Sequence, residues 1–286
     1  MRQSAWAGHK ESRRAAFLRK GQAVGRRLHR SVCGPLQALF QKSDGRHVMR
    51  WQEYLQELER LSKGSSQREV LEQVSAVEKT IKAYGKRKLP RHPLPKLGFS
   101  EEFIMDHLLD CTNLLELDSR LNDLRQTVIE NFGIWHIFSE DWLDDLALHL
   151  NGRKTLQLMA GNAVLSAGLA NVTATDSFDW SKQDVTRPDP WTKVESLDAT
   201  SAVEKYADVM DVIIMEWAPD TSEDDWEVLQ KLRTMRWPGE FIVIGEKNGA
   251  TNSEKFWDEC RLEEPEDLNQ RHERFDFIDD RVYLIG

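Results

Sequence analysis

Residues 155–176 read TLQLMAGNAVLSAGLANVTATD, and the order of apolar and small residues in this stretch predicts the fold. The apolar run at 155–160 has the length of a buried strand and breaks at Gly161-Asn162. Residues 162–169 can form a helix, and the next strand-like run ends at Asp176. We expect a strand, a turn, a helix and a second strand, which is the unit from which parallel sheets are built.

The same alternation of strand and helix continues to the end of the chain. Runs such as VIIM and FIVI are apolar on both faces, as in parallel strands that helices cover on each side. The final stretch, RFDFIDDRVYLIG at 274–286, predicts two strands around a turn at Asp279-Asp280. The other predicted elements are strands at 191–198, 211–216 and 240–246 and helices at 202–206, 225–235 and 253–260. The expected fold class is α/β: a Rossmann-like, mainly parallel sheet with a terminal antiparallel hairpin, preceded by a helical N-terminal region.

The first half of the chain shows helical periodicity. Two helical runs within 48–84 are separated by KGSS, and the prolines of KRKLPRHPLPKLG at 86–98 predict an extended linker. Further helices are expected after Ser100, across 113–131 and after Ser139. We therefore expect a basic, mostly helical N-terminal region with a Pro-rich linker (1–98), a helical connecting segment (99–138) and a Rossmann-like domain (139–286).

Charge is unevenly distributed along the 286 residues, whose net charge is -9. Residues 1–50 contain 12 Lys and Arg but only two acidic residues. A basic segment on an acidic chain predicts an arm for an anionic partner such as RNA. A solubilising tail is the alternative, and the Arg-rich start also resembles an organelle transit peptide.

Bulk composition narrows the class of protein. The chain is 40% hydrophobic and 30% charged, as in a globular domain, and has no apolar run near the roughly 20 residues that cross a bilayer. Its three cysteines are widely spaced and form no CxxC pair, so the sequence predicts neither disulfides nor a zinc site. We expect a cytoplasmic protein that is not bound to a membrane.

The carboxyl ends of the predicted strands carry the candidate chemistry, since ligands of open α/β sheets bind there. Small residues at 160, 161 and 163 would let a ligand approach backbone N–H groups. Asp176 could accept both hydroxyls of a ribose, and Asp198 could accept a bond from an adenine amino group. Each of these features taken alone also has an ordinary explanation. The small residues can form a plain turn, Asp176 can be a solvated acid and Asp198 can be a helix N-cap. Their order along three strand ends favours a nucleotide-like ligand.

The stretches TLQLMAGNAVLSAGL, TATDSFDW, VESLDA, DVIIMEWAPD and FIVIGEKNGATNSEKFW resemble the class I S-adenosylmethionine-dependent methyltransferases. The resemblance covers about residues 139–286. It implies S-adenosyl-L-methionine as cofactor, with Asp176 at its ribose and residues 216–219 facing its methyl group. The implied cofactor contacts are Gln157, Ala160, Gly161, Asn162, Ala163, Asp176, Asp198, Ala199 and Trp217.

The methyl acceptor is not identified by the sequence, although RNA or protein is favoured over a small molecule. Glu216 is a catalytic candidate because it could orient the acceptor or take its proton. Asp220 is the second candidate for this role. Trp180 and Trp217 could be stacking platforms or core residues.

Departures from the family pattern keep a second class of function open. The family usually has an acid where Gln157 stands and more glycine where Met159 and Ala163 stand. A non-catalytic, methyltransferase-like protein that binds RNA through its basic segment would fit these changes.

A nicotinamide-dependent oxidoreductase is a weaker hypothesis. The turn lacks a G-x-G-x-x-G run, because Gly161 is followed by Ala163 and Ser166. The sequence shows no evident metal-ligand set. His136 and His149 have apolar neighbours and are interpreted as packing residues.

Overall fold

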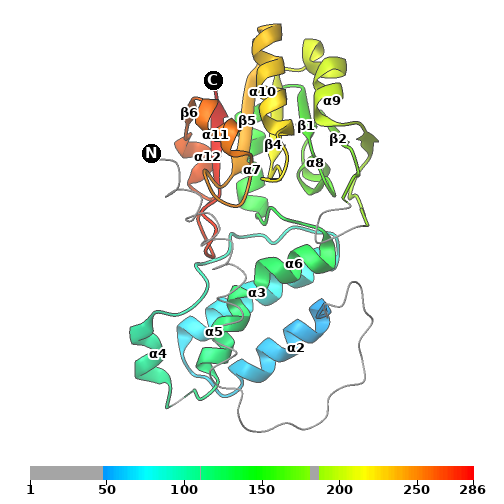
Figure 1. Ribbon diagram of the computed structural model, residues 1–286. Helices are drawn as coiled ribbons and strands as arrows, with labels where there is room; N and C mark the ends of the chain where they lie inside the picture. Colours follow the sequence, from blue (N-terminus) through cyan, green and yellow to red (C-terminus); the bar gives the residue numbers. More distant parts are fainter. Residues whose placement is uncertain (1–47, 110, 181–186) are drawn as a thin grey trace, which may run out of the picture. The chain divides into compact units, whose positions relative to one another are not determined.

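The computed structural model describes residues 48–109, 111–180 and 187–286, which contain a seven-stranded sheet (Figure 1). The strand order is β3-β2-β1-β4-β5-β7-β6. β1 to β5 are parallel, whereas β7 runs antiparallel to both β5 and β6. The predicted Rossmann-like, mainly parallel sheet with an antiparallel end is thus confirmed. The strands are β1 (Thr155–Leu158), β2 (Val172–Asp176), β3 (Val194–Ser196), β4 (Val212–Glu216), β5 (Glu240–Gly245), β6 (Leu262–Glu263) and β7 (Arg281–Ile285).

Helices cover both faces of this sheet, because successive side chains of a strand point to opposite sides. Val212 and Ile214 of β4 belong to one buried cluster, together with side chains of α7, α8 and α12. Ile213 and Met215 belong to another, with side chains of α9, α10 and α11. These helices are α7 (Glu140–Leu150), α8 (Val164–Gly168), α9 (Ala199–Tyr206), α10 (Asp224–Met235), α11 (Glu254–Glu259) and α12 (Glu266–Asn269).

The residues before α7 form a group of helices with its own apolar contacts. Tyr54 and Leu58 of α2 are buried with Leu117 and Leu121 of α5, and the Tyr54 hydroxyl donates a 2.7 Å hydrogen bond to the carbonyl of Arg120. The apolar side chains of these helices belong to the same buried cluster as those that cover the α7 face of the sheet. Its helices are α2 (Trp51–Ser62), α3 (Arg68–Tyr84), α4 (Glu101–His107), α5 (Leu114–Asn122) and α6 (Leu124–Phe132).

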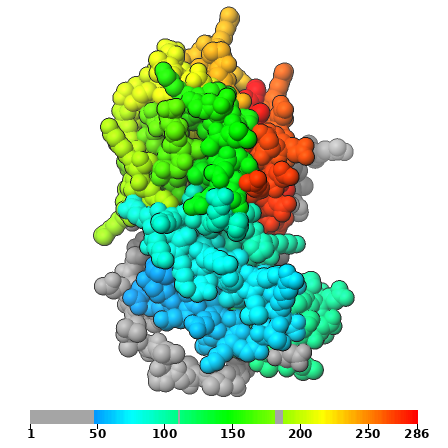
Figure 2. Space-filling model, turned by 180° about the vertical axis from the view of Figure 1, so that it is seen from behind, coloured from blue at the N-terminus to red at the C-terminus, as the bar shows by residue number. Residues whose placement is uncertain are grey.

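The Pro-rich linker lies against the start of α7. The main-chain N–H of Glu140 donates to the carbonyl of Pro90 at 2.8 Å, and Arg91 forms an ion pair with Asp141 at 3.0 Å. In Figure 2 cyan atoms of this part of the chain adjoin green atoms of the region that contains α7. The linker is therefore held by the protein, and the charge of Arg91 is offset by acidic side chains.

Two local expectations differ from the structure. The predicted helix across 113–131 is divided into α5 and α6 at Asp123, with neither glycine nor proline at the break. The terminal hairpin pairs β7 with β6 rather than with 274–278. The reason is that Asp276 turns its carboxylate to Arg125 and accepts the N–H of Ile278, which bends that segment.

The described elements belong to one compact unit, Met49–Gly286. Residues 1–47, which hold most of the basic segment, lie outside the described residues. None of the helices in the described ranges combines the length and apolar character needed to cross a bilayer.

Candidate functional site

The turn after β1 has an unusual backbone. Met159, Gly161 and Ala163 have φ values of 51°, 54° and 51°, in the left-handed region that only glycine adopts without cost. The N–H of Ala163 donates to the carbonyl of Ala160 at 2.7 Å and closes the turn. Ala160 and Ala163 are buried against Ala174 of β2, so the turn lies close to the neighbouring strand.

Left-handed residues other than glycine also follow the two strands beside β1. Phe178, just after β2, has φ of 57°, and Trp217, directly after β4, has φ of 52°. Such conformations cost on the order of 1–3 kcal/mol each and cluster at ligand sites. β2, β1 and β4 are adjacent, so the strained residues share one edge of the sheet. We take this edge, at the carboxyl ends of the strands, as the candidate functional site.

Asp176 lies buried at the centre of this edge. Its Oδ2 accepts the N–H of Gly161 at 2.8 Å, and its Oδ1 accepts the N–H of Phe178 at 2.7 Å and the indole Nε1–H of Trp180 at 3.1 Å. An ionised carboxylate offers about four acceptor positions. One position on Oδ2 is therefore left for a ligand hydroxyl, and Oδ1 gains another if the indole moves away.

Gln157 and Glu216 are joined across β1 and β4. Gln157 Nε2 donates a 2.6 Å hydrogen bond to Glu216 Oε1, and the hydroxyl of Ser166 donates to Gln157 Oε1. An acid at position 157 would bring two carboxylates together in a buried place, which is unfavourable. The glutamine that departs from the family pattern is therefore matched to the glutamate of β4.

Asn162 is a structural anchor of the turn. Its Nδ2 donates to the carbonyls of Phe132 and Gly133 at 2.7 and 3.1 Å, and its Oδ1 accepts the N–H of Asp189 at 2.7 Å. The side chain thus ties the turn to the end of α6 and to the segment before β3.

Asp198 is the N-cap of α9. Its carboxylate accepts the N–H and hydroxyl of Ser201 at 2.8 and 2.7 Å and the hydroxyl of Thr200 at 2.8 Å. The bonds from Ser201, followed by that from Thr200, lower the pKa of Asp198 to about 2. The side chain is exposed and keeps acceptor capacity on its solvent side, whereas Ala199 is buried in the α9 core.

Trp217 and Asp220 follow β4 but have different surroundings. The guanidinium of Arg125 stacks on the Trp217 ring, 4.6 Å from its centroid, and the indole Nε1–H donates to Asp280 at 3.0 Å. Trp217 is therefore fixed by protein contacts. Asp220 is exposed and lines an open groove of about 680 Å³ between residues 220–223 and 253–259.

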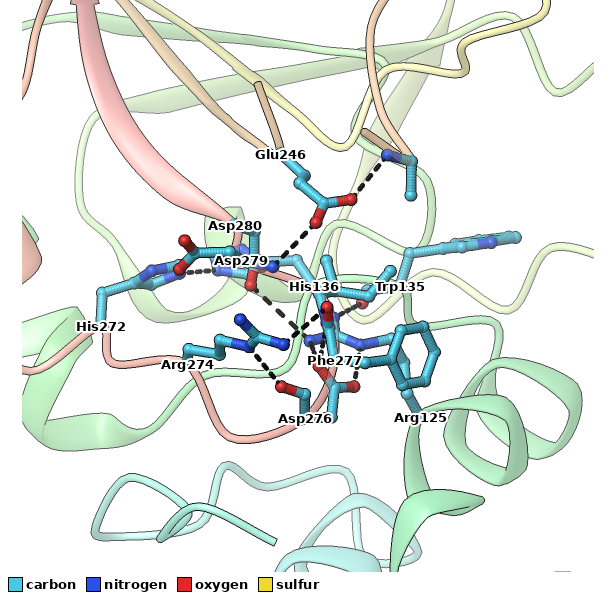
Figure 3. Close-up of polar contacts among 12 residues, drawn as sticks. Arg125, Trp135, His136, Glu246, His272, Arg274, Asp276, Phe277, Asp279 and Asp280 are labelled. Atoms are coloured by element: carbon cyan, nitrogen blue, oxygen red, sulfur yellow. Dashed lines mark hydrogen bonds and ion pairs between the residues drawn. The ribbon is translucent and has the colours of Figure 1, made fainter. Parts of the chain in front are cut away.

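A second polar group lies beside the site and comprises Arg125, His136, His272, Asp276 and Asp280 (Figure 3). Arg125 forms an ion pair with Asp276 at 2.6 Å, and both side chains are buried. His136 Nδ1 donates to Glu216 Oε2 at 2.8 Å, which joins this group to the end of β4. Burial lowers the pKa of His272 to about 4, so its ring is neutral. Burial acts to raise the pKa of Asp280, but Arg125, the two histidines and the hydrogen bond from Trp217 together outweigh it, so the pKa lies below its ordinary value.

His136 bonds through both ring nitrogens, so its role is more than the packing expected from its apolar neighbours. The sequence offers little signal for this group, because His272 lies 136 residues beyond His136. The two histidines meet only in the folded chain, where His136 bonds to both Glu216 and His272. His149 also has polar partners, with Nε2 2.9 Å from Glu240 Oε1.

A scan against protein-family models and a search of curated proteins give no match. Among solved structures, the chain is similar to one described as "a putative SAM-dependent methyltransferase from Streptococcus mutans", with 16% identity and a TM-score of 0.31. The match covers 57% of this chain and 48% of that one, so the chain spans about half of that protein. This is a distant similarity in fold and carries no argument about activity.

Proposed function

We propose that residues 139–286 bind S-adenosylmethionine and transfer its methyl group to an acceptor. The observation that carries the proposal is the backbone at the carboxyl ends of β1, β2 and β4, where strained residues surround Gly161 and Asp176. Strain at adjacent strand ends is typical of a ligand site, and open α/β sheets bind ligands at this edge.

The proposed contacts follow the geometry of the edge. Asp176 accepts the ribose hydroxyls after exchanging the indole bond of Trp180. The exposed face of Asp198, with Ala199, borders the adenine. The turn at Ala160, Gly161 and Asn162 borders the methionine end, where the N–H of Asn162 is the donor offered, because those of Ala160 and Gly161 already bond to Thr175 and Asp176. The remaining proposed contacts are Gln157, Ala163 and Trp217.

The catalytic demand in this proposal is mainly positioning. A sulfonium-bound methyl group is already activated, so holding the acceptor in line supplies much of the rate. Glu216 is held by His136 and Gln157 at 2.8 and 2.6 Å, which suits a residue that orients groups. Asp220 is exposed in a groove and is the better placed to accept a proton from an acceptor.

A second candidate function is a non-catalytic protein that keeps the methyltransferase-like fold. Two observations favour it: Asp176 already accepts three N–H groups of the protein, and both oxygens of Glu216 are bonded to protein side chains. Such a protein would bind the ligand weakly or not at all and would transfer nothing.

A transfer assay separates the two candidates. S-adenosylmethionine with a labelled methyl group is incubated with RNA, protein and metabolite fractions, and label in each fraction is counted. The methyltransferase proposal predicts transfer that Asp220→Asn reduces and that the control Asp208→Asn, an exposed acid away from the site, does not. Ligand binding without transfer to any fraction would favour the non-catalytic candidate.

The basic segment 1–50 carries a separate proposal, that it recruits an anionic partner, most simply RNA. Its 12 basic and two acidic residues are the observation in favour. Binding through phosphates weakens steeply with salt. Deleting residues 1–50 is expected to remove RNA binding at low salt and to leave ligand affinity unchanged. Equal RNA binding by both forms would contradict the proposal.

A further inference from the structure

His136, His272 and Asp280 bring their polar atoms together in the interior of the protein. One ligand-type atom from each side chain lies within 4.8 Å of the others, and all three residues are buried. His136 lies between α6 and α7, His272 follows α12, and Asp280 directly precedes β7. Figure 3 shows His136 and His272 facing each other beside Asp280.

The ring of His136 is oriented as in metal ligands. Glu216 accepts the hydrogen bond from Nδ1 at 2.8 Å, so this nitrogen carries the proton. Nε2 is then directed at Nε2 of His272, 2.8 Å away. A carboxylate behind a histidine fixes the tautomer and strengthens the opposite nitrogen as a donor to a metal ion.

Negative charge exceeds positive charge around this cluster. Glu216, Asp276 and Asp280 are carboxylates with side-chain exposures of 10%, 2% and 6%. Arg125 pairs with Asp276 at 2.6 Å and with Asp280 at 3.6 Å, and Arg274 bonds to the main-chain carbonyl of Asp276 rather than to a carboxylate. One paired guanidinium therefore faces three carboxylates. Buried carboxylates are costly without a compensating cation. A divalent cation between the two histidines and Asp280 would balance the group.

One buried nitrogen of the cluster lacks a partner. Nδ1 of His272 forms no hydrogen bond with any residue in the described ranges, although the side chain is buried. His272 and Asp280 also line a cavity of about 20 Å³, with Phe138 and Ser139 among its other walls. Such a cavity has room for one water molecule. The cluster thus offers three protein ligands, with room for a water molecule beside His272 and Asp280.

We propose that His136, His272 and Asp280 bind a divalent transition-metal ion, with Zn²⁺ preferred. Two imidazole nitrogens suit zinc and disfavour magnesium and calcium, which prefer all-oxygen sites. Zinc bonds of about 2.0–2.1 Å place tetrahedral ligand atoms about 3.3 Å apart. The two Nε2 atoms therefore separate by about 0.5 Å on binding, while the Asp280 carboxylate moves toward them. The ion would connect the segment before α7 to the segment before β7, and the inference does not depend on the proposed methyl transfer.

The test measures zinc in tag-free, full-length protein. The protein is stripped with a chelator, loaded with ZnSO₄ and desalted, and its metal content is determined by elemental mass spectrometry. A single zinc ion per chain is expected, together with a higher melting temperature in Zn²⁺ but not in Mg²⁺. The double variant with His136→Asn and His272→Asn is expected to lose the ion. The control His149→Asn changes a partly buried, carboxylate-paired histidine outside the cluster and is expected to keep it.

Folding of each variant is followed by circular dichroism in chelator, so that loss of metal is not confused with loss of structure. If the double variant does not fold, Asp280→Asn and Glu216→Gln replace it; Glu216→Gln is expected to weaken zinc about 10–100-fold. Absence of stoichiometric zinc in the wild-type protein would overturn the proposal. So would retention of zinc by a folded double variant.

Discussion

The main-chain N–H of Gly161 donates a 2.8 Å hydrogen bond to Oδ2 of Asp176, 15 residues further along the chain. The bond joins the turn after β1 to the end of β2, so the two features expected to touch a nucleotide also support each other. It leaves one acceptor position on Oδ2. The ligand site and the local fold therefore share this carboxylate.

Trp180→Phe is expected to strengthen binding of S-adenosylhomocysteine. The change removes the indole donor that occupies Oδ1 of Asp176 but keeps an aromatic ring. A net hydrogen bond is worth about 0.5–1.5 kcal/mol, which corresponds to a two- to tenfold gain in affinity by calorimetry. Trp135→Phe is the control, because Trp135 packs edge-on against Trp180, 5.5 Å between ring centroids. Unchanged or weaker binding by a folded Trp180→Phe variant would argue against the exchange.

Asp176→Ala is expected to affect both ligand binding and stability. The sequence left open a solvated acid at this position, but the buried carboxylate accepts three N–H groups that would lose their partner. Buried N–H groups without a hydrogen-bond partner should lower the free energy of unfolding by about 1–3 kcal/mol, which urea denaturation measures. The exposed Asp208→Ala should change stability by less than about 0.5 kcal/mol. Equal stability of the two variants would contradict the structural role.

Arg125→Met is expected to destabilise the protein by about 3–5 kcal/mol, because it leaves the buried carboxylates of Asp276 and Asp280 without their cation. Arg60→Met removes a surface ion pair with Glu57 and should cost about 0–1 kcal/mol. Chemical denaturation of both variants gives the comparison. A small effect at Arg125 would mean that the carboxylates are neutralised in another way.

The cap of α9 predicts a dependence on pH. Asp198→Ala should cost about 0.5–2 kcal/mol at neutral pH, whereas Asp198→Asn, which caps the helix without the charge, should cost less. The pKa of Asp198 is lowered from 3.8 to about 2 in the folded protein. Its extra stabilisation is therefore complete above about pH 4 and is lost as the pH falls through about 2. The gap between wild type and Asp198→Ala should narrow over this range, and a constant gap would contradict the assignment.

Local patterns explain how much of the fold could be predicted from the sequence. VIIM and FIVI are apolar on both faces, and the strand ends at Gly161 and Asp176 are visible from composition alone. The break at Asp123 could not be predicted, since no glycine or proline marks it. RFDFI alternates like a strand, yet the ion pair of Asp276 with Arg125, 151 residues away, overrides that pattern.

The candidate site was predictable only in part for the same reason. Residues near strand ends can be found one at a time, but their partners cannot. The bonds of Glu216 to His136 and Gln157 span 80 and 59 residues. The indole of Trp180 on Asp176 is a local contact, yet neither its burial nor its direction follows from residue types.

Calorimetric titration of full-length protein with S-adenosylhomocysteine tests the central claim most directly. We predict saturable binding with one site per chain and loss of that binding in Asp176→Asn, which keeps the shape of the side chain but not its charge. Adenosine with homocysteine added as separate molecules should bind more weakly, because the linked ligand spans the β1 and β2 ends at once. Absence of heat and of any melting-temperature shift at millimolar ligand in the folded wild-type protein would contradict the account.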